Sequence, residues 1–253
     1  MFVDEPLFRD SPLGGIDPRV RLALALPTVV CLAGLRGLPA CLLGLALSLL
    51  LLFFARPLPV PVLRRLAVVN VFLLFLWCVT PLTMPGEPLA QWGFLAISRA
   101  GVRLSLLVSL KANAIACVFL ALVAGMDAST VGYALVQLRC PAKLAFLFLF
   151  AARYVHVVAK EWQNLVTAAR LRAFEPRAGL HTCRTLASLL GLLLVRSYER
   201  SLRVREAMLL RGFTGHFYSV TEFRAHPADA LFASFVLAGL SAVICLEAGI
   251  FHV

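Results

Sequence analysis

Charged side chains are scarce in this sequence. Only 15% of its 253 residues are Asp, Glu, Lys or Arg, whereas 61% are hydrophobic and the mean hydropathy is +0.90. Ordinary soluble domains carry a charge on about 25% of their residues. The composition therefore excludes an ordinary soluble domain and predicts an all-α, polytopic membrane protein.

Motifs typical of enzymes and metal proteins are also missing. No G-x-x-x-x-G-K-[ST] occurs and none of the three lysines follows a glycine, so we expect no P-loop, no ATP binding by this chain and no catalytic residue. The five histidines show no H-x-x-x-H spacing, and the seven cysteines form no C-x-x-C pair. We therefore predict no resident metal ion, no cofactor and no disulfide framework.

Five apolar stretches predict membrane-spanning helices. A helix needs about 20 residues to cross the hydrocarbon, so the shorter stretches must include flanking residues. In "IDPRVRL", Asp17 and Pro18 suit the N-cap and the first helical position. We expect five or six spans in total. The stretches cover residues 20–35, 38–54, 66–80, 104–125 and 228–250.

The distribution of basic residues predicts the orientation of these spans. Residues 127–225 hold 14 of the 24 Lys and Arg against six acids, and shorter basic segments precede the first span and follow the second. By the positive-inside rule, these regions and the N-terminus face the cytoplasm of a bacterial cell. We expect a multi-pass inner-membrane protein with three regions. They are a four-span membrane region at 1–126, a cytoplasmic module at 127–225 and a final transmembrane helix at 226–253.

Two long helices are predicted within the cytoplasmic module. Residues 143–174 contain no Pro or Gly, and residues 181–211 contain only Gly191. At 1.5 Å per residue each helix would be about 45 Å long. Each is apolar in its first half and basic in its second, and the apolar parts are too short or too interrupted to predict membrane spans. We interpret them as crossing amphipathic helices at the inner membrane surface.

Both long helices end in arginine. Arg172 and Arg211 lie 39 positions apart, in last turns where a cation complements the helix dipole, and Gly212 suits the left-handed position that ends a helix. Exposed arginines at these ends could form forked hydrogen bonds to carboxylates in an acidic groove. The same pattern also occurs in helices that only meet anionic lipid, so the spacing and charge leave both interpretations open.

The segments "AARLRAFEPR" and "EAMLLRGF" resemble the paired Ala-Arg-Gly motifs of the transmembrane T component of energy-coupling factor (ECF) transporters. Other segments are similar to its cobalt/nickel subgroup, the CbiQ/NikQ family, and together they cover nearly the whole chain. Leu replaces the motif's Ala twice, and Ala173 replaces the first Gly, which predicts a less tight end for the first helix. The other segments are "DPRVRLALAL", "NVFLLFLWCVTPLTMPGEPL", "LKANAIACVFLAL", "PAKLAFLFLFAARYVHVV" and "LASLLGLLLVRSYERSLRVREAMLLRGFTGHF".

The resemblance implies a non-catalytic coupling subunit of a cobalt or nickel importer. Its partners would be two ABC ATPases of the CbiO or NikO type and a metal-binding membrane S component of the CbiM or NikM type, with room for a small accessory membrane subunit and no nucleic acid. Arg172 and Arg211 would contact the ATPases, each followed by the third motif residue, Ala173 or Gly212. The flanking candidates are Arg170, Glu206 and Met208.

Two other function classes remain as alternatives at this point. A membrane enzyme acting on a lipid phosphate would use the arginines as an anion clamp, but the acids of residues 127–225 include no D-x-x-D-like pair to hold Mg²⁺. A stand-alone secondary transporter would need a polar site near the membrane midplane. Asn70, Lys111 and Asn113 are the candidates near the spans, and we interpret Asn70 and Asn113 as polar residues that pack helices together.

Overall fold

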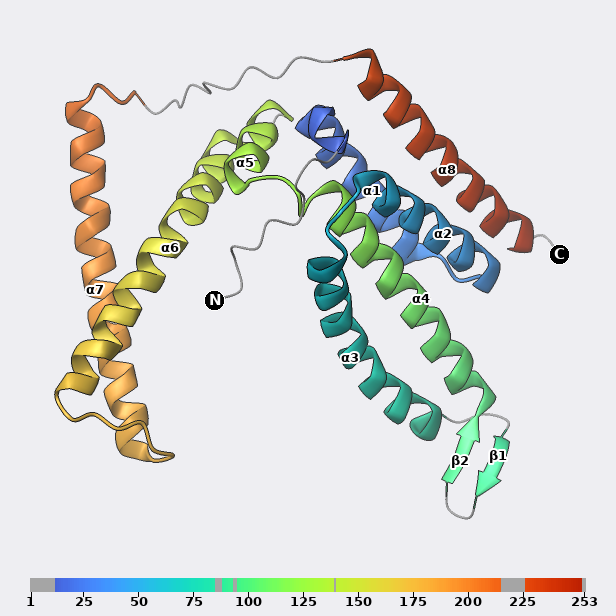
Figure 1. The fold of residues 1–253 in the computed structure, drawn as a ribbon, viewed down its shortest axis with the longest axis horizontal. Coiled ribbons are helices and arrows are strands. Elements are labelled where there is room, and N and C mark those ends of the chain that lie inside the picture. The colour runs from blue at the N-terminus through green and yellow to red at the C-terminus, as the bar shows by residue number, and fades with distance from the viewer. Residues whose placement is uncertain (1–11, 85–87, 93–94, 139, 215–225, 252–253) are drawn as a thin grey trace. The chain divides into compact units, whose positions relative to one another are not determined.

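The structure is a computed structural model, and it describes residues 12–84, 88–92, 95–138, 140–214 and 226–251 (Figure 1). Nearly all of these residues are helical, apart from one short antiparallel hairpin, which confirms the expected all-α membrane fold. The chain forms two compact units. One contains residues 1–134 and 222–253, and the other contains residues 135–221.

The first unit holds the apolar helices. Among the described residues, α2, α3, α4 and α8 are long and apolar enough to cross a membrane, while α1 has 17 residues and is slightly shorter. Its elements are the 3-10 turn η1 (Pro12–Gly15), α1 (Pro18–Gly34), α2 (Leu38–Ala55), α3 (Pro59–Thr83), the strands β1 (Pro88–Trp92) and β2 (Leu95–Ser98), α4 (Arg99–Leu122) and α8 (Pro227–Phe251). The short helix α5 (Ala128–Gln137) extends across the boundary between the units.

Helix α4 forms the centre of this unit. It contacts α1, α2 and α3, and its small residues Ala114, Cys117 and Ala121 are buried in these contacts. At Gly101 the backbones of α3 and α4 come so close that an added Cβ would lie 2.7 Å from the Cα of Pro81. Small residues permit this close approach in membrane helices. The small side chains of α4 therefore pack against this chain's own helices.

Polar side chains join α3 to α4. Asn70 and Asn113 exchange hydrogen bonds, with donor to acceptor distances of 3.1 and 3.3 Å, and the Nε1 of Trp77 donates to Ser109 at 2.7 Å. The interpretation of Asn70 and Asn113 as helix-packing residues is therefore confirmed. The remaining surface of α3 is largely exposed and apolar, as a helix in contact with lipid requires.

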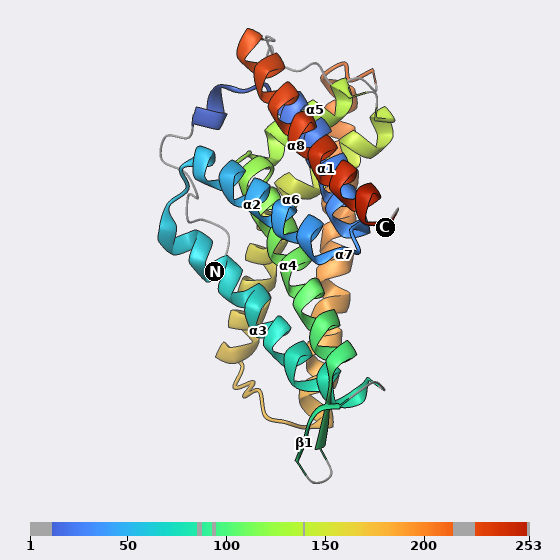
Figure 2. The same ribbon diagram turned by 90° about the vertical axis from the view of Figure 1, so that its right-hand side faces the viewer.

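Two carboxylates of α8 bind the backbone on either side of α1, at its N-cap and in the turn between α1 and α2. Asp229, in the first turn of α8, accepts hydrogen bonds from the backbone N–H of Asp17 at 2.9 Å and of His226 at 2.7 Å. Glu247 accepts from the backbone N–H of Arg36 at 2.8 Å and of Gly37 at 3.1 Å. Asp229 and Glu247 lie 18 positions apart on α8, which is about 27 Å along a helix. In Figure 2 α8 lies in front of α1.

These bonds fix how α1 and α8 align. Both helices begin at one level and α1 ends near the last turns of α8, so the two run in the same direction. Asp17 also caps α1 by accepting from the backbone N–H of Arg19 at 2.9 Å, as the sequence predicted. Helix α1 thus extends through most of the depth that α8 covers, although its 17 residues are fewer than those of the four longer apolar helices.

Candidate functional site

Two long helices make up most of the second unit. Helix α6 (Ala142–Leu171) has 30 residues and α7 (Leu180–Leu210) has 31, so each is about 45 Å long, as predicted. Pro141 precedes α6 and Gly179 precedes α7, which explains where they begin. The helices cross and run in opposite directions (Figure 1). Their C-terminal ends therefore lie on opposite sides of the crossing.

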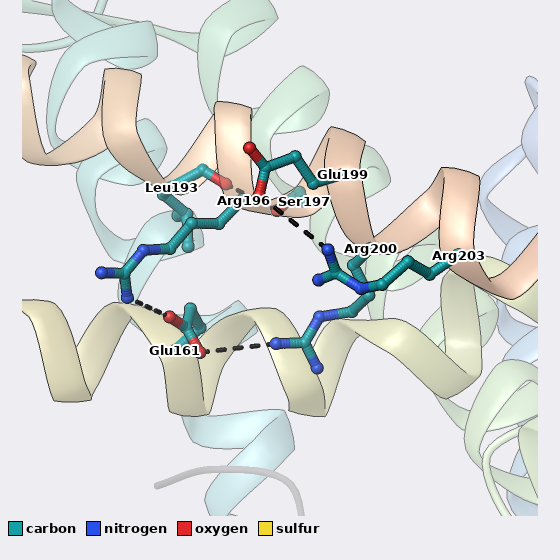
Figure 3. A network of polar contacts seen from close by, with 7 residues as sticks. All are labelled: Glu161, Leu193, Arg196, Ser197, Glu199, Arg200 and Arg203. Atoms are coloured by element: carbon teal, nitrogen blue, oxygen red, sulfur yellow. Dashed lines mark hydrogen bonds and ion pairs between the residues drawn. The ribbon is translucent and has the colours of Figure 1, made fainter.

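An ion-pair network connects the helices at their crossing (Figure 3). The carboxylate of Glu161 on α6 lies 2.6 Å from the Nη1 of Arg196 and 3.5 Å from the Nη2 of Arg200, both on α7. Two buried leucines lie close to these residues in the sequence. They are Leu165, four positions after Glu161, and Leu193, three positions before Arg196. Because the side chain of Glu161 is only 21% exposed, water screens these pairs less than it screens a pair on an open surface. The network holds α6 against α7 at one place along their length.

Helix α6 ends in a Schellman motif. The N–H of Ala173 donates to the carbonyl of Arg170 at 3.0 Å, and the N–H of Phe174 donates to the carbonyl of Ala169 at 3.1 Å. These two bonds satisfy carbonyls that a helix end otherwise leaves without a partner. Ala173 has a φ of 62°, in the left-handed region that glycine normally occupies. Ala173 thus adopts the glycine conformation, and the helix ends in this motif although the glycine is replaced.

Helix α7 ends in the same motif. The N–H of Gly212 donates to Leu209 at 3.0 Å and the N–H of Phe213 donates to Met208 at 3.0 Å, with a φ of 76° at Gly212. Residues 171–174 read Leu-Arg-Ala-Phe and residues 210–213 read Leu-Arg-Gly-Phe, so the likeness extends over four positions. We call residues 169–174 and 208–213 the two tips. Leu, Arg and Phe recur at matching positions of the two tips, in the same backbone geometry.

Arg172 and Arg211 are the C-cap residues of their helices, and both side chains are exposed. Within the described part of the chain, neither guanidinium makes an ion pair or a hydrogen bond. Arg170 and Glu206 are exposed on the last turns of α6 and α7, near these arginines. Met208 is partly buried and lines a cavity between the helices. The structure thus places four of the predicted side chains at an accessible surface and Met208 facing inward.

The left-handed backbone conformation of Ala173 leads to a prediction for one substitution at each tip. An L-residue in this conformation costs about 1 kcal/mol relative to glycine, because its Cβ lies close to the backbone. We expect Ala173→Gly to protect the Phe174 amide about fivefold more against hydrogen exchange, and Gly212→Ala to reduce the protection of Phe213 by a similar factor. Unchanged exchange at both amides would contradict the assigned geometry.

The sequence did not reveal the cavity, which has a volume of about 530 Å³. It lies between the first half of α6 and the second half of α7, the half that ends at Arg211. Side chains spaced about one helical turn apart form its apolar walls, and Arg200 and Arg205 add positive charge. The spacing was visible in the sequence, but the cavity depends on the angle between the helices. Its lining includes Phe150, Tyr154, Val158, Val204, Met208 and Phe213.

No metal site emerges from the described ranges. Within them, no three His, Cys, Asp or Glu side chains gather closely enough to hold an ion. The two exposed arginines at the helix ends remain the candidates for contact with a partner.

Comparisons with known proteins identify the family. Residues 9–221 match the family model CbiQ, described as cobalt transport protein. The chain is 25% identical over 250 residues to the energy-coupling factor transporter transmembrane protein EcfT of Thermanaerovibrio acidaminovorans, covering 92% of this chain and 90% of that protein. It is 33% identical over 94 residues to the nickel permease LarQ of Lactiplantibacillus plantarum, but this match spans only 37% of this chain and 34% of the permease. The resemblance seen in the motifs is confirmed, and the chain belongs to the CbiQ family of cobalt transport proteins.

Proposed function

We propose that this chain is the transmembrane T component of an ECF importer for cobalt or nickel, coupling a pair of ABC ATPases to a metal-binding membrane S component. Its family consists of transport proteins, and the relative that matches it over most of its length is named as an ECF transmembrane protein. One observation carries the proposal. The crossed helices end in two tips of equal geometry, each with an exposed arginine that has no partner among the described residues.

The tips act as the ends of two levers in this proposal. Glu161 and Arg172 lie 11 positions apart, and so do Arg200 and Arg211, so each tip lies about 16 Å beyond the crossing. Since the tips point in opposite directions, they are on the order of 30 Å apart. Two ATPase subunits, each holding one tip, would change the angle between the helices as they close and open.

The angle change passes to the membrane partners through rigid helices. Neither α6 nor α7 contains a proline, so a force at a tip turns the whole helix about the crossing. The cavity between α6 and α7 widens or narrows with that angle, because its two walls belong to different helices. An S component in contact with these helices would tilt in response. The S component also holds the metal ion and determines whether it is cobalt or nickel.

Charge and the alignment of α1 with α8 support the proposed orientation. Positive residues dominate the second unit, which favours the cytoplasmic side of a bacterial inner membrane. Helices α1 and α8 begin at one level, as they must if both start in the cytoplasm. Five crossings by α1, α2, α3, α4 and α8 are consistent with this proposal, since they leave the starts of α1 and α8 on the same side.

Isolation of the native complex tests the proposal. We expect the chain, purified from its own membrane in mild detergent, to bring with it a P-loop ATPase and a second small membrane protein, and membranes containing the complex to take up radioactive cobalt or nickel with ATP. A chain that purifies alone and supports no uptake would contradict the proposal. A secondary transporter or a lipid-phosphate enzyme would then have to be tested.

A further inference from the structure

Leucine residues at the two tips are unusually exposed. Leu210 is 90% exposed and Leu171 is 84% exposed, and no other large hydrophobic residue with a described exposure exceeds 82%. Each is the last residue of its helix and immediately precedes the C-cap arginine. The same exposed pair, Leu followed by Arg, thus occurs at both ends of the lever.

The surroundings of these leucines differ from those of other exposed apolar residues. Leu147 and Leu194 are 69% and 71% exposed, but they lie in apolar parts of α6 and α7 that suit contact with lipid or a membrane protein. Leu171 lies between Arg170 and Arg172, and Leu210 directly precedes Arg211. A single exposed apolar side chain is common on a protein surface. These two leucines stand out because they recur at the same position, next to the same arginine, at both tips.

The backbone is fixed at each tip, where the leucine and the arginine extend from neighbouring Cα atoms. Consecutive Cα atoms are about 3.8 Å apart, and the Schellman bonds of each tip hold the backbone in one conformation. Phe174 and Phe213 are partly buried, so at each tip the leucine and the arginine protrude farther than the phenylalanine. A groove that receives the arginine must therefore accommodate the leucine beside it.

We propose that Leu171 and Leu210 are apolar anchors for the two ATPase subunits, and that each ATPase groove places an apolar pocket next to carboxylates. This inference rests on the proposed function and specifies what the partner must look like. Charge complementarity supplies the acidic side of the groove, since each tip carries an exposed arginine without a partner among the described residues. The repeated Leu-Arg pair gives both grooves the same chemistry.

The test uses the assembled transporter with both leucines shortened. We expect Leu171→Ala with Leu210→Ala to weaken retention of the ATPases by about 10- to 100-fold per leucine, because each substitution removes most of a side chain buried in the complex. The readout is the ratio of ATPase to this chain after purification, titrated with added ATPase. Leu147→Ala with Leu194→Ala is the matched control, with the same substitutions on the same helices away from the tips, and should retain the ATPases.

Further variants separate the possible outcomes. Leu171→Met with Leu210→Met keeps an apolar side chain of similar size and should restore retention, which a loss caused by misfolding would not allow. If the alanine pair retains the ATPases while Arg172→Glu with Arg211→Glu loses them, the proposed function stands and the anchor role is overturned. That result would also be expected if the leucines only touch lipid. If both pairs retain the ATPases, the docking role of the tips fails as well.

Discussion

Reversing the charge of both tip arginines, Arg172→Glu with Arg211→Glu, is expected to remove the ATPases from the complex and to lower metal uptake by at least 10²-fold. Losing one member of a buried, hydrogen-bonded charge pair costs about 2–5 kcal/mol, and reversal adds repulsion from the partner's carboxylates. Because the double variant changes both tips, the loss of binding free energy is expected to be about twice that of one substitution. The measurements are the ATPase content of the purified complex and the ATP-dependent uptake of labelled cobalt or nickel.

The single-arginine variants test whether the two tips contribute equally. Because both tips have the same hydrogen-bond pattern and both arginines are C-caps, we expect Arg172→Glu to be as harmful as Arg211→Glu. A matched control is Arg153→Glu with Arg184→Glu, which makes the same change of charge at one exposed arginine of each helix, away from the tips. It should leave uptake unchanged. Normal ATPase retention by the double tip variant would rule out the docking role.

Removing the charge at the crossing is expected to separate ATP hydrolysis from transport. Glu161→Gln keeps the shape of the side chain but loses two ion pairs, together worth about 1–2 kcal/mol at this exposure. We expect the tips to keep their ATPases, ATP hydrolysis to continue and metal uptake to fall about tenfold, because α6 and α7 no longer turn about one fixed point. Uptake per ATP hydrolysed in reconstituted vesicles measures this directly.

Glu199→Gln provides the control for that variant. Glu199 pairs with Arg203 at 4.0 Å within α7, so the substitution makes the same chemical change without affecting the contact between the helices (Figure 3). It should transport normally. If Glu161→Gln transports as well as Glu199→Gln, the crossing does not serve as the pivot.

The sequence predicted the helices better than their contacts. Pro141 and Gly179 mark where α6 and α7 begin, and an uninterrupted helical run between such residues can be read directly. The ion pairs of Glu161 could not be read, because its partners lie 35 and 39 positions away and are two of many arginines. Partner choice depends on the crossing angle, which arises from packing. The cavity could not be predicted for the same reason, since it also depends on the crossing angle.

Ala173 shows a second limit of sequence reasoning. Propensity favours glycine at the left-handed position, and the difference is about 1 kcal/mol. Two backbone hydrogen bonds stabilise the same conformation. Together they contribute more free energy than the left-handed alanine costs. A preference of this size predicts which residue is common at a helix end. It does not decide whether the helix ends there.

The bonds between α8 and α1 also bear on how the protein is made. During synthesis the chain appears from its N-terminus at roughly 5–20 residues per second, and α8 comes last. Until then, the backbone N–H groups of Asp17, Arg36 and Gly37 lack the carboxylates that accept from them in the finished protein. The membrane unit therefore cannot be completed before residues 135–221 have left the ribosome. A chain cut short after α7 would lack those carboxylates, which gives the cell's quality control a physical difference by which to recognise an unfinished subunit.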